Sequence, residues 1–292
     1  MSIPVENSIS EIKNSVIAAD EQSPADSGFY WAAADGVRVL KCRALMDAGF
    51  ENGFSTRLGG VSPFPAGDLN LAGFSEDSNE NIQENRRRFL KAFAGERTLA
   101  TVWQVHGSDI KVVRNADNAA ESDEKFDAVA SDLPNLLAAV KTADCVPVLL
   151  GDTRRRAYAA VHAGWRGTVA SIAAKALDVM KNEFGTDAKD LIAAIGPAAC
   201  VRNYEIGEDV IEQFAANFPG WKDYFTPTRP GHALVDLHKA NRDQLIEAGV
   251  SDADIYTAPF CTMESTDLFF SYRKEKQLHG KTGRLLSVIG QL

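Results

Sequence analysis

Two side chains that could do chemistry flank one polar turn of the chain. Cys145 precedes the apolar run 146–150, and His162 follows the apolar run 157–161, with the polar residues 151–156 between the runs. If the runs pair as an antiparallel hairpin, the midpoint of Cys145 and His162 falls inside the turn, so the two side chains lie almost opposite each other. Directly opposed residues have Cβ atoms about 4.5–5.5 Å apart. A thiol and an imidazole at that separation are either metal ligands or a nucleophile and its general base.

A second histidine, His106, also ends an apolar run beside a glycine, where its side chain can face a cleft. His106, Cys145 and His162 together make a Cys/His₂ set, without the fourth ligand and the short C-x₂-C element that structural zinc sites usually have. Three ligands with an open fourth position are typical of catalytic zinc, which can activate a bound water or phosphate oxygen. The spacing alone leaves open the alternative of two unconnected histidines and a core cysteine.

Three polar residues near this trio are further candidates for the site. Asp144 adjoins the cysteine and could orient a ligand imidazole or transfer protons, or it could be a turn residue. Arg166 lies in a segment that joins a strand end to a helix expected to begin at Thr168, an arrangement that favours anion binding. Arg57 lies in the Gly-rich segment 53–62, where a guanidinium could clamp a phosphate or simply be solvated.

The composition limits the kinds of partner. The 292 residues are 45% hydrophobic and 24% charged, which is typical of a soluble globular protein. The net charge of -9 makes wholesale binding to nucleic acid or to an anionic membrane unfavourable. No apolar run approaches the ~18 residues that span a bilayer, and the first twenty residues lack the apolar region of a signal peptide. We therefore expect a cytoplasmic protein with neither a membrane nor a nucleic-acid partner.

The order of the expected elements favours one mixed α+β body. Residues 1–36 read as an N-terminal extension, partly disordered or peripheral, and residues 37–292 as the catalytic domain. Helical periodicity covers residues 79–94, 168–184, 207–218 and 235–248, and strands include 268–272. Several strands are joined by tight turns, which favours a mixed sheet over a doubly wound parallel one. Four cysteines in a chain of this length do not suggest a disulfide framework, and three of them, Cys42, Cys200 and Cys261, are expected to be buried.

Several longer motifs together resemble one known family. They are G-F-S-T-R-L-G-G-V-S at 53–62, W-Q-V-H-G at 103–107, T-A-D-C-V-P-V-L-L at 142–150, A-A-V-H-A-G-W-R-G-T at 159–168, I-G-P at 195–197, Y-E-I-G at 204–207, C-T at 261–262 and F-F-S-Y-R at 269–273. The family is that of the laccase-domain, or multicopper polyphenol oxidase-like, proteins, more recently described as purine nucleoside phosphorylases and including the peptidoglycan editing factor. The resemblance runs in order from about Val37 to the C-terminus.

The resemblance implies a fold, a metal site and a set of substrates. The implied fold is a single α+β domain with two mixed β-sheets flanked by helices in α-β-β-α layers, similar to deamidating-toxin-type cysteine hydrolases. The implied zinc ligands are His106, Cys145 and His162, the trio reached above from the residues. Members are described as phosphorolysing adenosine, inosine, guanosine and methylthioadenosine, and as deaminating adenosine. One departure is Phe74, which stands where the family often carries a histidine.

The older copper-oxidase description can be tested against the histidine count. A trinuclear cluster plus a blue-copper site needs on the order of ten histidines and a soft thiolate, whereas this chain has five histidines and no H-x-H pair. Four-copper laccase chemistry is therefore rejected, although copper could occupy the Cys/His₂ site adventitiously.

Three functional hypotheses follow. The leading one is a zinc-dependent purine nucleoside phosphorylase with adenosine deaminase activity, in which Arg57 or Arg166 holds phosphate and Asp144 transfers protons. The second is an amide hydrolase that edits peptidoglycan precursors, with Cys145 as nucleophile and His162 as base. The third is a non-enzymatic metal-binding protein.

Overall fold

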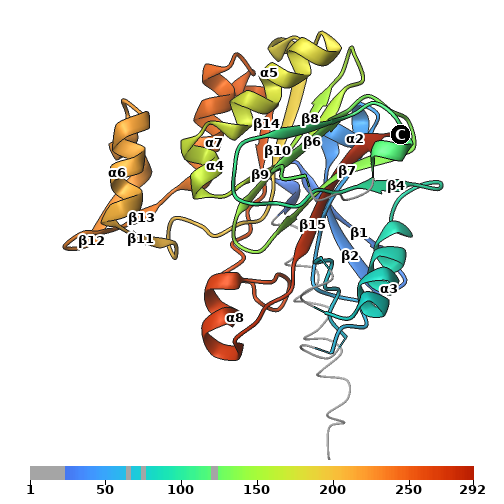
Figure 1. The fold of residues 1–292 in the computed structure, drawn as a ribbon, viewed down its shortest axis with the longest axis horizontal. Helices are drawn as coiled ribbons and strands as arrows, with labels where there is room; N and C mark the ends of the chain where they lie inside the picture. Colours follow the sequence, from blue (N-terminus) through green and yellow to red (C-terminus); the bar gives the residue numbers. More distant parts are fainter. Residues whose placement is uncertain (1–23, 64–66, 74–76, 120–123) are drawn as a thin grey trace, which may run out of the picture.

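The structure is a computed structural model, and it describes residues 24–63, 67–73, 77–119 and 124–292. Within these ranges two six-stranded sheets pack face to face, and helices cover the outer face of each sheet (Figure 1). This architecture confirms the expected α+β domain with two mixed sheets in α-β-β-α layers. Phe74 and residues 1–23 lie outside the described residues.

The first sheet contains the strand nearest the N-terminus and the last strand of the chain. Its order is β1 (Phe29–Ala34), β2 (Val37–Cys42), β3 (Phe50–Ser55), β15 (Leu285–Gln291), β7 (Leu136–Thr142) and β4 (Thr98–Ala100). Neighbours are antiparallel, except that β4 runs parallel to β7. β1 pairs with β2 along its whole length and buries Phe29. The sheet therefore begins inside residues 1–36, the segment expected to be an extension.

The second sheet carries the hairpin that was expected from the apolar runs. Its order is β14 (Ile255–Thr257), β10 (Leu191–Ile195), β8 (Val146–Asp152), β9 (Tyr158–Ala163), β6 (Ala128–Ser131) and β5 (Ile110–Val113). The outer pairs β10–β14 and β5–β6 are parallel, and the inner pairs are antiparallel. The sheet is thus mixed, and β8 and β9 lie at its centre.

The two-residue period of the strands explains why their sequences read as continuous apolar runs. Along β8, Val146, Val148 and Leu150 pack in the cluster beneath the helices, whereas Leu149 packs in the cluster between the sheets. β7 divides in the same way, because Val140 faces the second sheet and its neighbour Ala139 faces the opposite side. Both faces of each central strand are buried, so no polar alternation marks these strands in the sequence.

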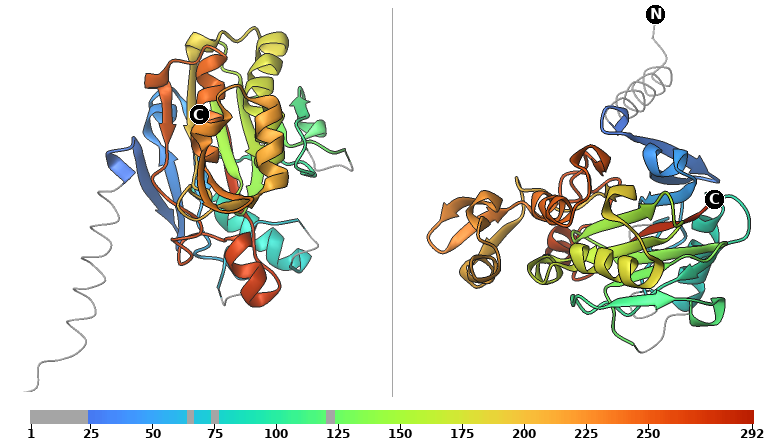
Figure 2. Two further views of the ribbon diagram at one scale, coloured as in Figure 1. Left: turned by 90° about the vertical axis from the view of Figure 1, so that its left-hand side faces the viewer. Right: turned by 90° about the horizontal axis from the view of Figure 1, so that it is seen from above.

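Helices close the two outer faces of the sandwich. α3 (Asn79–Leu90) covers the first sheet and is capped by the Ser78 hydroxyl, which accepts a hydrogen bond from Asn81 N. α5 (Ile172–Phe184) and α7 (Leu237–Glu247) cover the second sheet (Figure 2). The helix expected over 168–184 is interrupted, because Ser171 has φ 58° and separates α5 from the short α4 (Trp165–Val169). The strand expected at 268–272 is wrong, since that segment leads without strand pairing into α8 (Tyr272–His279).

A small excursion of the chain stands beside this body. It consists of β11 (Glu205–Gly207), α6 (Glu208–Asn217), β12 (Phe225–Arg229) and β13 (His232–Val235), and its three strands form a separate sheet. Figures 1 and 2 show this unit projecting from one side of the sandwich. Among the described residues, no helix has the length and apolar character needed to cross a membrane.

Candidate metal centre

Three side chains far apart in the sequence meet at one end of the second sheet. The ligand atoms of His106, Cys145 and His162 all lie within 4.8 Å of one another. The two imidazole rings are 4.9 Å apart between centroids and meet edge to face at 76°. His106 comes from the loop between β4 and β5, Cys145 from the turn before β8, and His162 from β9. The structure therefore brings together the trio expected from the sequence.

The hairpin register differs from the expected one by two residues. Val146 pairs with Ala163, and Pro147 pairs with His162. Cys145 therefore lies diagonally from His162, on the same face of the sheet, rather than directly opposite it. Long side chains still meet across such a diagonal. The place next to Cys145 is taken by Gly164, where an added Cβ would lie 3.2 Å from the Cys145 Sγ and 2.9 Å from a ring carbon of His106.

A buried aspartate that the sequence analysis missed organises both histidines. The Asp127 carboxylate accepts hydrogen bonds from the backbone N–H groups of Val105, His106 and Gly107, at 3.2, 2.9 and 2.6 Å. The same carboxylate lies 2.7 Å from Nδ1 of His162. These contacts hold the loop that presents His106, whose φ of 60° is unusual for a residue other than glycine. Because β6 pairs with β9, Asp127 lies beside His162, and the His162 N–H donates to the Asp127 carbonyl oxygen at 2.8 Å.

Asp127 also fixes which nitrogen of His162 can bind a metal. With Nδ1 directed at the carboxylate, Nε2 is left for ligation, which is the arrangement common among metal-bound histidines. Asp144 had been expected as a candidate for this role. Its carboxylate instead accepts hydrogen bonds from the Thr262 hydroxyl at 2.7 Å and from Arg273 N at 2.6 Å. The imidazole-orienting residue is therefore Asp127 and not Asp144.

The electrostatics of the trio favour a thiolate. Burial opposes the ionisation of Cys145, but the charges and hydrogen bonds of His162 and His106 outweigh it and lower the pKa of the thiol to about 6. Burial likewise opposes protonation of His162, but Cys145 and Asp127 outweigh it and raise the pKa of that imidazole to about 9. Without a metal the pair is thus a thiolate and an imidazolium. The thiolate is also the form that binds a metal ion.

The donor set and its spacing fit a zinc ion. Tetrahedral zinc with Zn–N distances of about 2.0–2.1 Å and a Zn–S distance of about 2.3 Å needs donor atoms roughly 3.3–3.6 Å apart. The observed upper limit of 4.8 Å allows this with small side-chain rotations. His162 is buried, Cys145 is half-buried and His106 is exposed. The centre is therefore open on one side, as a three-ligand site that admits a further ligand must be.

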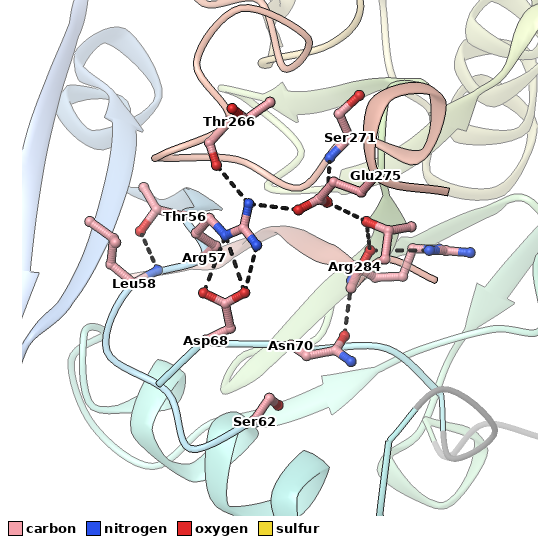
Figure 3. A network of polar contacts seen from close by, with 12 residues as sticks. Thr56, Arg57, Leu58, Ser62, Asp68, Asn70, Thr266, Ser271, Glu275 and Arg284 are labelled. Carbon is pink, nitrogen blue, oxygen red and sulfur yellow. Dashed lines mark hydrogen bonds and ion pairs between the residues drawn. The ribbon is translucent and has the colours of Figure 1, made fainter. Parts of the chain in front are cut away.

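Arg57, a candidate for phosphate binding, lies in a buried ion-pair network (Figure 3). Its guanidinium binds the carboxylate of Asp68 at 2.7 Å and that of Glu275 at 2.8 Å. It also donates to the carbonyl oxygen of Thr266 at 2.6 Å and lies 4.5 Å from the centre of the Phe270 ring. Two carboxylates already surround this one cation, so a phosphate there would meet net negative charge. The clamp role expected for Arg57 is not supported by these contacts.

Arg166, the other phosphate candidate, lies beside the centre. It is exposed on α4, and its guanidinium stacks 4.2 Å above the Trp165 ring. The expected start of a helix at Thr168 is wrong, because α4 already begins at Trp165 with Gly164 as its N-cap. Arg166 therefore lies in the first turn after the strand that carries His162.

A pocket of about 320 Å³ lies on the side of the small sheet and is lined by Trp165, three residues after His162, and not by the three candidate ligands themselves. Its lining includes Trp165, Tyr204, Arg229, His232 and Arg273, together with the acids Glu205 and Asp209. Tyr204 lies near enough to Cys145 to feel its charge, although burial is the main cause that raises the pKa of this tyrosine to about 12. Arg273 lies over the Tyr204 ring at 4.9 Å and donates to the carbonyl oxygen of Glu205. The pocket thus contains aromatic faces and a guanidinium, and its Tyr204 lies near Cys145.

Comparison with known proteins agrees with this geometry. Residues 51–291 match the family described as multi-copper polyphenol oxidoreductase laccase. The chain belongs to this laccase family. A relative from Deinococcus radiodurans named "Purine nucleoside phosphorylase" is 39% identical over 260 residues, covering 88% of this chain and 94% of the relative. One of the same name from Bacteroides thetaiotaomicron is 35% identical over 243 residues, covering 80% and 89%.

Solved structures of the laccase family share the fold. The crystal structure of YlmD from Geobacillus stearothermophilus superposes with a TM-score of 0.79 at 32% identity, covering 89% of this chain and 97% of that one. YfiH from Bacillus licheniformis gives a TM-score of 0.79 at 29% identity over the same shares. The family match and the shared fold show a laccase-family domain, and His106, Cys145 and His162 form a candidate metal centre within it.

Proposed function

We propose that the chain is a zinc-dependent purine nucleoside phosphorylase that also deaminates adenosine. The observation that carries this proposal is the Cys/His₂ group backed by Asp127. The names of the relatives support the reaction class, and the nitrogen and thiolate donors support zinc. A zinc ion held by His106, Cys145 and His162 would polarise a phosphate oxygen or activate a water at neutral pH.

The pocket supplies groups for both halves of the substrate pair. A purine ring can stack on the faces of Trp165 and Tyr204, which are flat, apolar and partly rigid. We assign phosphate to Arg273, which lines the pocket, and to Arg166, which is exposed on α4 outside the pocket lining, because guanidinium groups bind phosphate oxygens in a fork geometry. Arg229 is a weaker candidate, since it already pairs with Glu205 at 2.8 Å. Adenosine, inosine, guanosine and methylthioadenosine are the nucleosides that we propose as substrates.

Asp144 is the residue to which we assign proton transfer. It is largely buried, and its two carboxylate oxygens are held by Thr262 and by the backbone of Arg273. Burial raises the pKa of this carboxyl, although the hydrogen bonds from Arg273 and Thr262 partly offset the effect. A raised pKa makes a carboxyl group a better proton donor near neutral pH. The leaving purine needs such a proton on a ring nitrogen.

Two further assignments accompany this proposal. We assign copper, which binds nitrogen and sulfur ligands more tightly than zinc, only as an adventitious occupant of the centre. We keep the cytoplasm as the compartment, because all four cysteines are free and free thiols persist in reducing compartments.

The test of the main proposal is a product assay with a matched cysteine variant. Zinc-loaded protein is incubated with adenosine and phosphate, and adenine, ribose 1-phosphate and inosine are measured by chromatography. Cys145→Ser should lose both zinc and products, whereas Cys42→Ser, which changes a buried free cysteine between the sheets, should keep both. Zinc-loaded protein that yields none of the three products would refute the proposal. If only adenine and ribose 1-phosphate appear, the deaminase half fails alone.

One feature favours a second candidate. The Cys145 thiol lies beside the His162 imidazole, which in turn contacts the Asp127 carboxylate. A nucleophile, a base and an orienting carboxylate arranged in this spatial order are the groups of a cysteine hydrolase. The alternative is therefore an amide hydrolase that acts on peptidoglycan precursors without a metal. Zinc-free protein that cleaves such an amide, and loses the activity when Cys145 is alkylated, would favour it. A third outcome, in which Cys145→Ser changes metal content and no substrate turns over, would favour a metal-binding protein.

A further inference from the structure

Two other cysteines meet outside the metal centre. Cys200 follows β10, and Cys261 lies in the loop after β14, where it forms a parallel β-bridge with Ala198. The backbone N–H of Cys200 donates to the Sγ atom of Cys261 at 3.2 Å. Both Sγ atoms and a carboxylate oxygen of Glu264 lie within 4.8 Å of one another. Backbone pairing therefore holds the two thiols side by side although they are 61 residues apart.

The two thiols have different surroundings. Cys261 is 3% exposed, and its pKa is raised by burial and, next, by its hydrogen bond with Cys200. Cys200 is half-buried, and its thiol donates a hydrogen bond to a carboxylate oxygen of Glu264 at 3.7 Å. The side-chain amide of Asn203 donates to the Cys200 Sγ at 3.4 Å, and the Arg202 guanidinium lies nearby. Cys261 is thus the more deeply buried of the two thiols, and Cys200 is the one nearer the surface.

The groups around Glu264 make a metal site less suitable here. Its carboxylate is bound by the guanidinium of Arg202 at 2.6 and 2.9 Å and by the amide of Asn203 at 2.6 Å. A metal ion would have to displace both donors and share the site with a fixed positive charge. A half-buried thiol next to a second thiol is instead the arrangement found in redox-sensing cysteine pairs.

We propose that Cys200 and Cys261 form a reversible disulfide when the protein meets hydrogen peroxide. The Cys200 thiolate attacks one peroxide oxygen, the O–O bond breaks, and hydroxide leaves, so that Cys200 becomes a sulfenic acid. The sulfur of Cys261 then attacks the Cys200 sulfur, the S–O bond breaks, and the departing hydroxide takes the Cys261 proton. Two thiols and one peroxide thus give one disulfide and two waters. A dithiol reductant reverses the change.

The disulfide would act on the pocket through backbone contacts. Thr262, next to Cys261, donates its hydroxyl to Asp144, and Ala199, next to Cys200, donates its N–H to the carbonyl oxygen of Asp144. The carbonyl oxygen of Cys200 accepts the N–H of Tyr204, which lines the pocket. Closing the sulfur atoms to about 2.0 Å draws these two segments together. The cysteine pair therefore ties the position of Asp144 and Tyr204 to the redox state.

The test maps cysteine chemistry in the folded protein. Wild-type protein is treated with hydrogen peroxide, blocked with N-ethylmaleimide, digested without reductant and analysed by mass spectrometry. We expect a linked pair of peptides carrying Cys200 and Cys261, lighter by two hydrogens and separated by dithiothreitol. In Cys261→Ser, Cys200 should go on to sulfinic acid, and Cys42 should stay unmodified in every sample. Hydrogen exchange of the peptides that contain Tyr204 and Thr262 should slow when the disulfide forms.

Three results would overturn this inference. The first is Cys200 that reaches sulfinic acid as fast in the wild type as in Cys261→Ser, because no resolving thiol would then be acting. The second is a disulfide from either cysteine to Cys145. The third is a stoichiometric metal ion that stays bound in Cys145→Ser and protects both thiols from peroxide. Unchanged hydrogen exchange after disulfide formation would overturn the coupling to the pocket.

Discussion

Replacing Asp127 by asparagine should weaken zinc binding without unfolding the protein. The side chain keeps its size, but an amide has one accepting oxygen where the carboxylate has two. If that oxygen faces His162, the new NH₂ group faces the N–H groups of Val105 and Gly107, which lose their acceptor. If the amide is turned over, its NH₂ group faces Nδ1 of His162. That imidazole must then carry its proton on Nε2, where it blocks metal ligation.

The magnitude follows from the contacts. Loss of a carboxylate behind a ligand histidine costs about 10–100-fold in metal affinity, or about 1.4–2.7 kcal/mol. A fully buried N–H group without an acceptor costs about 1–3 kcal/mol in stability, and the N–H groups of Val105 and Gly107 lie in part-buried hydrogen bonds, so each should cost less. Although burial favours the neutral acid, the hydrogen bond and charge of His162 outweigh it and lower the pKa of Asp127. The stabilisation of the folded protein by Asp127 is therefore complete above the pKa of the unfolded chain, about 3.9. It is lost as the pH falls through the lower pKa that Asp127 has in the folded protein.

The assay is competition for zinc against a chromophoric chelator at neutral pH, with circular dichroism to confirm that the variant is folded. Asp152→Asn is the matched control. Asp152 is also fully buried and accepts backbone N–H groups, from Arg154 and Arg155, but it lies at the turn end of the β8–β9 hairpin, away from His162. We expect the control to keep wild-type zinc affinity. A folded Asp127→Asn protein with unchanged zinc affinity would refute the reasoning.

Three further predictions test other parts of the structure. Gly164→Ala would place a Cβ 3.2 Å from the Cys145 Sγ, so the affinity for zinc should fall about tenfold, or about 1.4 kcal/mol. The control is Gly73→Ala, whose Cβ would meet nothing within 4 Å and which should bind zinc as the wild type does. Equal zinc affinities of the two variants would contradict this prediction. In zinc-free protein, the rate at which iodoacetamide alkylates Cys145 should rise with pH, with a midpoint near pH 6. Cys42, whose pKa is raised to about 11 by burial, should stay unreacted. A Cys145 midpoint at the ordinary value of 9.0 would be inconsistent with the ion pair. Arg57→Met should lower the free energy of unfolding in urea by about 3–5 kcal/mol, because two buried carboxylates lose their cation; a loss below about 1 kcal/mol would argue against that network.

The sequence was sufficient for the residues whose signals are local. The apolar runs on either side of residues 151–156 predict the hairpin, and the histidines and cysteine at strand ends predict the Cys/His₂ group. The register was wrong because symmetry about the turn is not decided by the turn residues alone. The Asp152 N–H donates to the carbonyl oxygen of Ala157. Thr153 donates its N–H and its hydroxyl to the carbonyl oxygen of Asp190, which directly precedes the neighbouring strand β10. These contacts move the centre of the hairpin by one residue.

Other features depend on partners that the sequence does not place together. Asp127 stands in an ordinary K-F-D-A-V segment, and its importance appears only when β6 pairs with β9. The sequence signal that could have pointed to Asp127 is an acidic residue placed directly before a buried strand. Arg57 looked like a free loop arginine because one of its two carboxylate partners, Glu275, comes from α8 near the end of the chain.

The candidate metal ligands and most of the pocket lining come from different parts of the chain. His106, Cys145 and His162 all belong to the stretch 106–162, which contributes β5, β6 and β8 to the second sheet and β7 to the first. The pocket lining includes residues of the excursion, such as Ile206, Arg229 and His232, whose small sheet has its own strand pairing. Because Ile206, Val210 and Phe214 of the excursion pack in the core cluster of the second sheet, exchanges there must keep these side chains to leave the ligands in place. Replacing residues 205–235 by those of a relative would change which small molecule the pocket prefers and leave the candidate metal ligands unchanged, because His106, Cys145 and His162 lie outside the replaced segment.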